Sequence, residues 1–534
     1  DVLLSLVGSE MCIRDRYRCD GRRCGSMEPE YFDVVIVGAG ISGIGSAWHL
    51  QNRCPGKRYL ILEGRESLGG TWDLFRYPGI RSDSDMYTLG FGFKPWRDGK
   101  AIADGPAILD YLRETSAENR IEEHIRFSHL VKSADWSSDD ACWTVQAENK
   151  ASGETVSFRC GFLLMCSGYY SYKQGYLPEF RGRDEYRGEI VHPQFWPDEL
   201  DYAGKQVVVI GSGATAVTLI PEMAKQTASI TMLQRSPTYM VAMPDTDWIA
   251  NVLRKILPEK WAYAIIRWKN IRFQRFIYWR ARSAPDKVRK KLLDLARKEV
   301  GPDSDFDTNF VPRYNPWEQR LCLVPNADFF HAVRDGKASI VTDTIDTFTE
   351  TGIRLESGRE IEADIIITAT GLELCVLGDA QFRVDGEDVD FADTWSYKSM
   401  MFSGVPNMIS TFGYVNASWT LKADLTAAYA CRVIGHRDET GARICVPELR
   451  EEDRDMPALP WIDGFSSGYI QRKMHLLPKQ GDRWPWTNTQ NYLADRKAVL
   501  EGPVDDGALR FSGYAESAIM EAHQQNLSTD VSSL

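Results

Sequence analysis

The sequence predicts an α/β protein with two dinucleotide-binding, Rossmann-like domains, in which the first domain is discontinuous and the second is inserted into it. Three observations lead to this prediction. A strand-like run followed by a glycine-rich turn occurs twice, at residues 33–43 and 205–217. Two further strand-to-loop stretches, 162–170 and 364–374, look like the places where the chain crosses between domains. A length of 534 residues leaves room for both domains and a helical insert, at about 150 residues per domain.

The first glycine-rich turn has the spacing of a dinucleotide site. It reads DVVIVGAGISG, so Gly38, Gly40 and Gly43 follow an apolar run and precede a helix-like stretch. The first glycine allows a tight turn, the second lets the backbone approach a pyrophosphate, and the third lets the helix pack closely. A second strand-like run ends in Glu63, twenty residues after Gly43, where an acid accepts hydrogen bonds from a ribose diol.

The second glycine-rich turn belongs to a similar strand–turn–helix–strand unit, which ends in an arginine. Arg235 stands nineteen residues after Ala216, where the first unit has a carboxylate. A guanidinium binds a 2′-phosphate that a carboxylate would repel, and Ser236 adds a hydroxyl, so we expect NADPH here. The predicted NADPH-binding residues are Gly211, Ser212, Gly213, Ala214, Thr215, Ala216, Arg235 and Ser236.

Two nested sites of this kind predict a flavoprotein in which NADPH reduces FAD. The FAD domain is expected to comprise 27–165 and 375–534, including a C-terminal segment, with the NADPH domain at 166–374 between them. Residues 1–26 lack the pattern of a signal peptide, and their string VGSEMCIRDR resembles a translated sequencing-adapter artefact. We therefore expect them to be a non-native extension.

Composition and charge exclude several classes of protein. The net charge is −12, which disfavours nucleic-acid binding for the chain as a whole. The eleven cysteines contain no C-x-x-C pair, and the histidines show no metal-ligand spacing, so we expect no metal site and a reducing cytoplasm. No apolar run reaches the roughly 18 residues of a transmembrane helix.

Basic residues are concentrated in one stretch of this acidic chain. Between Arg254 and Lys298 there are fifteen Lys or Arg and three Asp or Glu, a balance of +12, and the rest of the chain sums to −24. Residues 248–298 are predicted to be a helical insert in the NADPH domain. Two interpretations stay open: a packed helical subdomain whose charges are solvated and steer NADPH, or peripheral attachment to an anionic membrane.

Two further motifs indicate the kind of flavoprotein. The stretch LGGTWDLFRYPG has no cysteine, which excludes a disulfide reductase. Residues 69–83, GGTWDLFRYPGIRSD, and 186–197, YRGEIVHPQFWP, resemble the two fingerprints of the class B Baeyer–Villiger monooxygenases, with Tyr186 in place of Phe. Stretches such as TWDLFRYPGIRSDSDMYTLGF and GYVNASWTLKAD are most similar to the ethionamide-activating type of that family.

The resemblance implies a reaction. NADPH reduces the flavin, O2 adds to it, and a flavin C4a-peroxide attacks a ketone to give an ester or lactone; thio-compounds are a possible further substrate. Arg320, in NPWEQRLCLVPN, matches the family's catalytic arginine, and Asp83 matches the acid that orients it. A fixed cation suits this task, because the reaction develops negative charge.

The resemblance also implies further cofactor contacts. Ser42, Trp72 and the Val131 backbone match FAD contacts, whereas Arg81 and Ser82 are expected near the nicotinamide. Gln319 stands where many relatives have a lysine that helps hold the 2′-phosphate, so Arg235 carries more of the NADPH preference. His192 is expected to stabilise a domain linker.

Two alternatives remain open from the sequence. One is a flavin monooxygenase that oxygenates only nitrogen or sulfur. The other is a flavin-binding relative without catalysis, which the presence of Arg320 and Asp83 disfavours.

Overall fold

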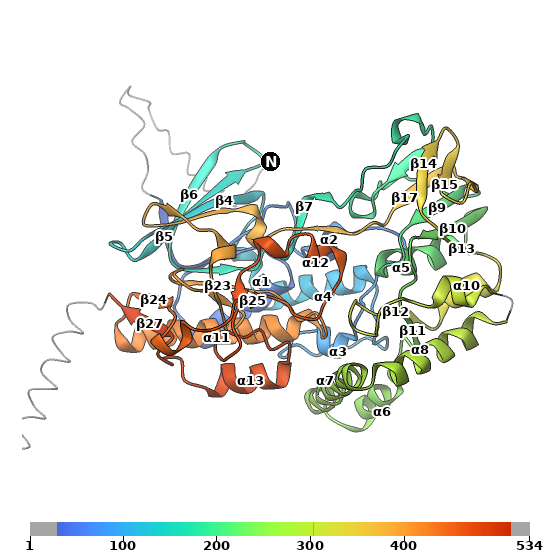
Figure 1. Cartoon of the computed structure of the whole chain (residues 1–534). Helices are drawn as coiled ribbons and strands as arrows, with labels where there is room; N and C mark the ends of the chain where they lie inside the picture. The colour runs from blue at the N-terminus through green and yellow to red at the C-terminus, as the bar shows by residue number, and fades with distance from the viewer. Residues whose placement is uncertain (1–28, 303, 514–534) are drawn as a thin grey trace, which may run out of the picture.

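The computed structural model describes residues 29–302 and 304–513. The predicted extension at 1–26 and the end of the C-terminal segment lie outside these residues. Two α/β regions lie side by side, each built around its own sheet, with a group of helices below them (Figure 1).

The larger sheet has nine strands and is mixed, with both parallel and antiparallel pairing. β1 (Glu30–Val37) pairs in parallel with β2 (Tyr59–Leu62) and β6 (Thr155–Met165). Its apolar sequence is buried because helices or strands cover both faces of a central parallel strand. The other strands are β3 (Ile125–Arg126), β4 (His129–Ser137), β5 (Cys142–Asn149), β19 (Gln381–Val384), β20 (Glu387–Asp388) and β23 (Met408–Ser410). The pairing is parallel around β1, whereas β5 pairs antiparallel with β4 and β6. α1 (Ile41–Arg53) follows β1 and packs on α11 (Trp419–Thr440).

The smaller sheet is parallel throughout, with the order β13-β10-β9-β17-β8. Its strands are β8 (Glu189–Val191), β9 (Gln206–Ile210), β10 (Ser229–Gln234), β13 (Ser339–Thr342) and β17 (Ile365–Thr368). α5 (Ala214–Met223) follows β9 directly. An antiparallel sheet of β14 (Ile345–Thr349), β15 (Gly352–Leu355) and β16 (Glu360–Glu362) adjoins it.

The chain passes between the two sheets along one antiparallel pair. β7 (Tyr170–Gly175) pairs with β18 (Leu372–Leu374), so the two crossings run side by side. The His192 ring lies against this pair: a Cβ added to Gly175 would be 2.0 Å from its Cε1 atom. The expected role of His192 beside a linker is consistent with this contact. The exact domain boundaries stay predictions.

The insert consists of three helices that join the two regions. α6 (Trp248–Ile256) and α7 (Glu259–Ser283) contribute Ala250, Tyr263 and Ile266 to the hydrophobic core of the larger sheet. α8 (Pro285–Val300) contributes its last turn to the core of the smaller sheet. The insert therefore packs on both regions, although in sequence it interrupts only the second.

The remaining elements are short or peripheral. The helices are α2 (Thr71–Leu74), α3 (Met86–Leu89), α4 (Gly105–Glu118), α9 (Phe306–Phe310), α10 (Asp328–Arg334), α12 (Gly468–Gln471) and α13 (Tyr492–Glu501). The strands are β11 (Met240–Met243), β12 (Cys322–Pro325), β21 (Ser396–Tyr397), β22 (Met401–Phe402), β24 (Ile444–Pro447), β25 (Leu459–Pro460), β26 (Lys479–Gln480) and β27 (Leu509–Ser512).

Candidate active site

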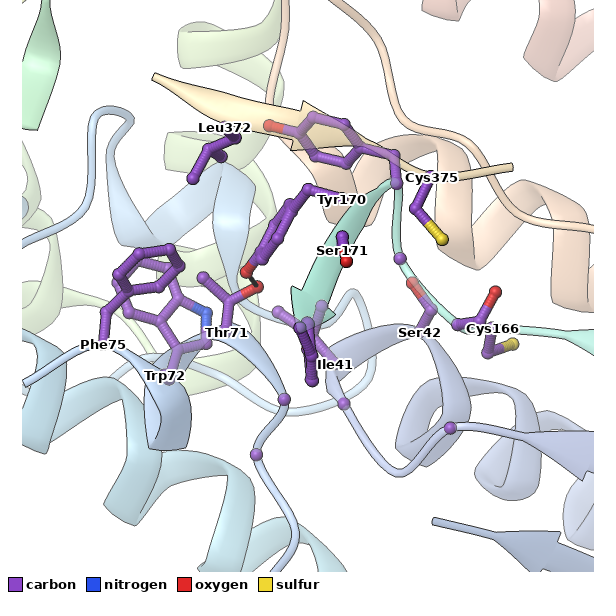
Figure 2. A pocket seen from close by; sticks show the side chains of 18 of the residues that line it. Ile41, Ser42, Thr71, Trp72, Phe75, Cys166, Tyr170, Ser171, Leu372 and Cys375 are labelled. Carbon is purple, nitrogen blue, oxygen red and sulfur yellow. Dashed lines mark hydrogen bonds between the residues drawn. The ribbon is translucent and has the colours of Figure 1, made fainter. Parts of the chain in front are cut away.

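A cavity of about 480 Å³ is lined by residues of both α/β regions (Figure 2). Most of the residues predicted to contact a cofactor or to act in catalysis line it. They are Gly38, Gly40, Ser42, Glu63, Trp72, Arg81, Ser82, Asp83, Val131 and Arg320, together with Ala214 and Thr215 of the second turn. The other predicted residues lie outside its lining: Gly43, Gly211, Ser212, Gly213, Ala216, Arg235 and Ser236.

The first glycine-rich turn makes two close backbone contacts. Gly38 has a φ of +103°, and a Cβ there would lie 2.6 Å from the Cys166 carbonyl oxygen. A Cβ on Gly43 would lie 1.9 Å from the Gly38 carbonyl oxygen, so only glycine lets α1 begin so close to β1. Gly40 precedes α1, where unpaired N–H groups favour a pyrophosphate. The residues present fit an FAD site.

Glu63 is buried at the end of β2 and holds the same turn. Its Oε2 accepts a hydrogen bond from the Ala39 N–H at 2.7 Å, and its Oε1 accepts one from the Arg65 N–H at 2.9 Å. Burial raises the pKa of the Glu63 carboxyl, although these backbone donors oppose the shift. A carboxylate has further lone pairs, so a ribose hydroxyl could still donate to it from the cavity.

Ser42 has a partner that the sequence reasoning did not identify. The Trp419 indole Nε1 donates to Ser42 Oγ at 2.8 Å and thereby joins the start of α11 to the start of α1. Trp419 also stacks on Tyr169, with ring centroids 5.2 Å apart. The stretch GYVNASWTLKAD contains Trp419, but nothing in its spacing showed that this ring would reach the first glycine-rich turn.

The other two expected FAD contacts lie on different elements. Trp72 is on α2, next to Thr71, whose hydroxyl is 2.5 Å from the Tyr170 hydroxyl. Val131 is on β4, beside a shift in the β4–β5 register between Val131 and Ser133. Such an irregularity interrupts the regular pairing of backbone groups. The cofactor contacts themselves stay predictions.

Arg320 and Asp83 form an ion pair in the cavity. The Arg320 Nη2 atom is 2.9 Å from Asp83 Oδ2, and 39% of the Arg320 side chain is accessible. The Asp83 carboxylate raises the pKa of Arg320 above its ordinary value, so the guanidinium stays charged. Arg320 precedes β12 in the smaller region, and Asp83 ends the first fingerprint in the larger one.

Two tyrosines near this pair were also not predicted. Burial raises the pKa values of Tyr169 and Tyr469, and the nearby Arg320 charge opposes both shifts. Both hydroxyls are therefore protonated at neutral pH. The two rings lie near each other, with centroids 6.2 Å apart. Tyr169 lies within the predicted crossing at 162–170, and Tyr469 comes from α12, so only the fold brings them together.

Arg81 and Ser82 are engaged with protein groups. The Arg81 Nη1 atom is 2.5 Å from Asp328 Oδ2, at the start of α10. The buried Ser82 hydroxyl accepts a hydrogen bond from the Ala103 N–H at 3.2 Å. Arg81 and Asp83 thus make two separate ion pairs from one short segment to the smaller region. The expected contact of Arg81 and Ser82 with the nicotinamide stays a prediction.

The second glycine-rich turn is open on the side where a pyrophosphate would lie. Gly211 has a φ of +128°, and a Cβ there would be 2.3 Å from the Ala369 carbonyl oxygen, whereas a Cβ on Gly213 would meet no atom within 4 Å. The Ser212 hydroxyl donates to the Ser236 carbonyl at 3.1 Å. Arg235 is exposed directly after β10, at the same sheet edge as this turn because β9 and β10 are parallel neighbours. These residues fit an NADP site.

Comparison with known proteins identifies the family. The model described as "flavin-binding monooxygenase-like" matches residues 101–377, and a model of NAD(P)-binding Rossmann-like domains matches 36–104. The chain is 54% identical over 484 residues to the FAD-containing monooxygenase EthA of Mycobacterium tuberculosis (strain ATCC 25618 / H37Rv), covering 90% of this chain and 98% of that protein. The chain belongs to the flavin-binding monooxygenase-like family.

A second curated relative agrees with this assignment, and solved structures share the fold. A probable FAD-binding monooxygenase AlmA of Acinetobacter sp is 48% identical and covers 91% of this chain and 97% of its own length. A steroid monooxygenase bound to NADP has a TM-score of 0.73 at 23% identity, covering 90% of this chain and 99% of its own. Cyclohexanone monooxygenase from Rhodococcus sp. Phi1 has a TM-score of 0.69 at 20% identity, and the match covers 91% of this chain and 100% of that one. The predicted fold class is confirmed, and the expected cofactors agree with these names.

Proposed function

We propose that this flavin-binding monooxygenase uses FAD and NADPH to insert one oxygen atom of O2 into ketones, giving esters or lactones. In the overall reaction one C–C bond beside the carbonyl becomes C–O–C, the second oxygen atom leaves as water, and NADPH supplies two electrons. The observation that carries the proposal is the Arg320–Asp83 ion pair, which lies in the cavity between the two nucleotide-binding turns.

The chemistry of oxygen transfer is supplied by the reduced flavin when FAD is bound, and the protein supplies binding and electrostatics. Arg320 offers a permanent positive charge, because Asp83 raises its pKa and guanidinium does not lose its proton in proteins. Negative charge that develops on the substrate oxygen is stabilised by such a fixed cation. Asp83 orients the guanidinium.

Aromatic side chains line the cavity beside Arg320, among them Tyr169 and Trp419. Tyr169 lies against Phe412 and Trp419, with ring centroids 5.4 Å and 5.2 Å away. Apolar side chains in the cavity wall beside the guanidinium lower the local dielectric constant, which strengthens its electrostatic effect. An apolar ketone suits such a wall better than a charged substrate.

The proposal is tested by product analysis. Purified protein loaded with FAD is mixed with NADPH, O2 and a panel of small ketones and thioethers, and products are identified by mass spectrometry. We expect esters or lactones from at least some ketones. NADPH oxidation that yields only hydrogen peroxide across the panel, or sulfur oxides without any ester, would overturn the proposal; the second result would support the heteroatom-only alternative.

A further inference from the structure

The insert helices α6 and α7 expose an unusual set of large apolar side chains. Seventeen large hydrophobic residues are exposed in the described chain, and ten of them lie between 248 and 279. They include four tryptophans, of which Trp248 is 72% exposed and Trp261 is 68% exposed. Solvated helices that only steer a charged cofactor need exposed cations but no exposed tryptophans.

These side chains form a stripe along one side of α7. Trp261, Ile265, Trp268, Phe276 and Trp279 are spaced by three, four or eight residues, which puts them on one face of a helix. The exposed residues Arg272 and Arg275 lie on the same side. On α6 the exposed side chains recur every four residues, and they are Trp248, Val252 and Ile256. These eight apolar residues of α6 and α7 and the two arginines are called the aromatic–cationic face.

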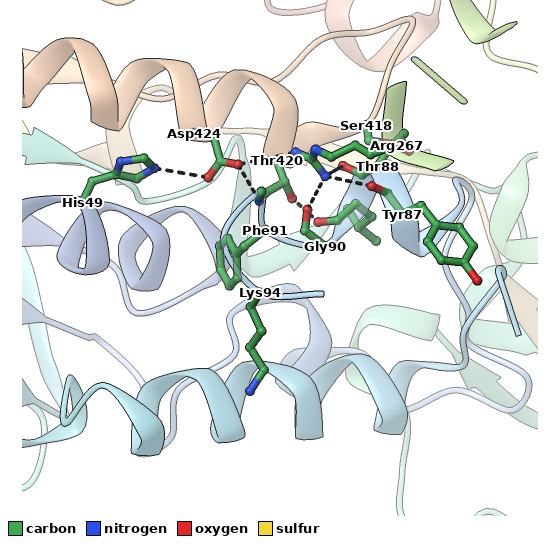
Figure 3. Close-up of polar contacts among 12 residues, drawn as sticks. His49, Tyr87, Thr88, Gly90, Phe91, Lys94, Arg267, Ser418, Thr420 and Asp424 are labelled. Atoms are coloured by element: carbon green, nitrogen blue, oxygen red, sulfur yellow. Dashed lines mark hydrogen bonds and ion pairs between the residues drawn. The ribbon is translucent and has the colours of Figure 1, made fainter. Parts of the chain in front are cut away.

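The opposite side of α7 is fixed to the larger region (Figure 3). The buried Arg267 donates to the carbonyl oxygens of Tyr87, Thr88 and Gly90 at 2.9, 3.3 and 2.7 Å. Its Nη2 atom is 3.4 Å from Asp424 Oδ2. Two more α7 side chains bind the Asp85 carboxylate: Asn270 and Gln274 each donate a hydrogen bond to it at 2.8 Å. The outer stripe is therefore exposed on a helix whose inner side is packed against the larger region.

We propose that the aromatic–cationic face binds the surface of an anionic membrane. Tryptophan is enriched where an apolar phase meets water, because its ring is apolar and its N–H is polar. Arginine pairs with lipid phosphates while its stem lies on the apolar side chains. The guanidinium carbon of Arg272 lies 4.5 Å from the centre of the Trp268 ring, a cation–π contact that places positive charge directly on the aromatic stripe.

Charge favours a membrane over a second copy of the chain. The stretch from Arg254 to Lys298 carries a balance of +12, so two such faces would repel each other. The rest of the chain carries −24 and is repelled by anionic lipid, which orients the insert toward the membrane. In Figure 1, α6 and α7 lie at the lower edge of the molecule. Within the described residues no helix is long and apolar enough to cross a bilayer, so the proposed contact is peripheral.

The test is co-sedimentation of the full, FAD-loaded protein with two kinds of vesicle. One contains phosphatidylcholine alone and the other adds phosphatidylglycerol. We expect sedimentation with the anionic vesicles only. Replacing Trp261, Trp268 and Trp279 together by Ser should remove it, and Arg272→Gln with Arg275→Gln should weaken partitioning at least about tenfold, because each basic residue near such a surface contributes about 1 kcal/mol.

Control variants distinguish loss of the aromatic–cationic face from a general effect of removing an exposed apolar side chain or of unfolding. Phe195→Ser and Leu459→Ser remove exposed apolar side chains outside the insert and should leave sedimentation unchanged. The thermal midpoint and the rate of NADPH oxidation in solution should be unchanged in every variant. Sedimentation that is equal with neutral vesicles, that is absent with both, or that survives the tryptophan substitutions would overturn the proposal. So would a concentration-dependent dimer that the tryptophan variant abolishes.

Discussion

The Nη2 atom of Arg320 lies 2.9 Å from Oδ2 of Asp83, and this contact joins the two α/β regions inside the cavity. Asp83 ends the fingerprint at residues 69–83, in the larger region, and Arg320 precedes a strand of the other region. The positive charge of Arg320, to which we assign a role in oxygen transfer, is thus positioned by Asp83 of the other region. Loss of Arg320 and loss of Asp83 should therefore have different effects on the reaction.

Replacing Arg320 by Ala should abolish product formation while FAD stays bound and reducible by NADPH. Removal of one preorganised electrostatic group typically costs about 10²–10³ in rate. NADPH consumption should continue and release hydrogen peroxide. Product yield and peroxide yield per NADPH measure the outcome. Asp83→Asn keeps the shape of the partner but removes its charge, so we expect a smaller loss; ester formation at the normal rate in the Ala variant would refute the assignment.

Replacing Arg235 by Ala should reduce the preference for NADPH over NADH. A charge-assisted hydrogen bond contributes about 1.5–3 kcal/mol, so KM for NADPH should rise about tenfold to a hundredfold with little change for NADH. Steady-state oxidation of each coenzyme provides the measurement. Lys205→Ala, at an exposed lysine before β9, is a control that should change neither value. An equal rise for both coenzymes would argue against a 2′-phosphate contact.

Replacing Gly43 by Ala should prevent proper folding of the first nucleotide-binding unit. The added Cβ would be 1.9 Å from the Gly38 carbonyl oxygen, so α1 or the turn must move. We expect a lower thermal midpoint and loss of bound flavin absorbance. Gly40→Ala is the matched substitution: its Cβ would lie 3.6 Å from the Gly70 Cα, so the protein should fold but bind FAD more weakly. Equal midpoints for the two variants would contradict this reading of the turn.

Stability should fall in weak acid because of His192. Burial lowers the pKa of this imidazole from its ordinary value of 6.5, while the Gly371 backbone opposes the shift. The folded state therefore binds its proton at lower pH than the unfolded state does, so stability is fully present above about pH 6.5 and decreases as pH falls below it. His192→Asn should flatten the dependence of the unfolding midpoint on pH between about 7 and 5. An unchanged slope would show that other groups dominate.

The candidate site was predictable where local sequence fixes the backbone. The close contacts at Gly38, Gly43 and Gly211 follow from the need for a tight turn between a strand and a helix, and spacing alone identifies them. Glu63 is predictable for a similar reason, since it ends the strand next to that turn. Arg235 was predicted as an NADPH contact because the first unit offered a direct comparison at the same position, and this contact stays a prediction.

The rest of the site depends on contacts between distant segments. Trp419, Tyr169 and Tyr469 come from three separate parts of the chain, and no periodicity indicates that their rings reach Ser42 or Arg320. The ion pair of Arg81 with Asp328 was likewise not predictable, because the sequence offers many acidic residues as partners and only the packing of the two regions selects one.

The sequence by itself determined the two nucleotide-binding units, their order along the chain and the position of a basic helical insert, because each depends on short-range spacing. The tertiary structure alone decided how the insert is used. Arg267 became a buried anchor and Arg272, one and a half turns later, became part of the exposed face, although both are arginines in the same basic helix. Which side of a helix is buried depends on what the chain packs against it, and that partner lies far away in the sequence.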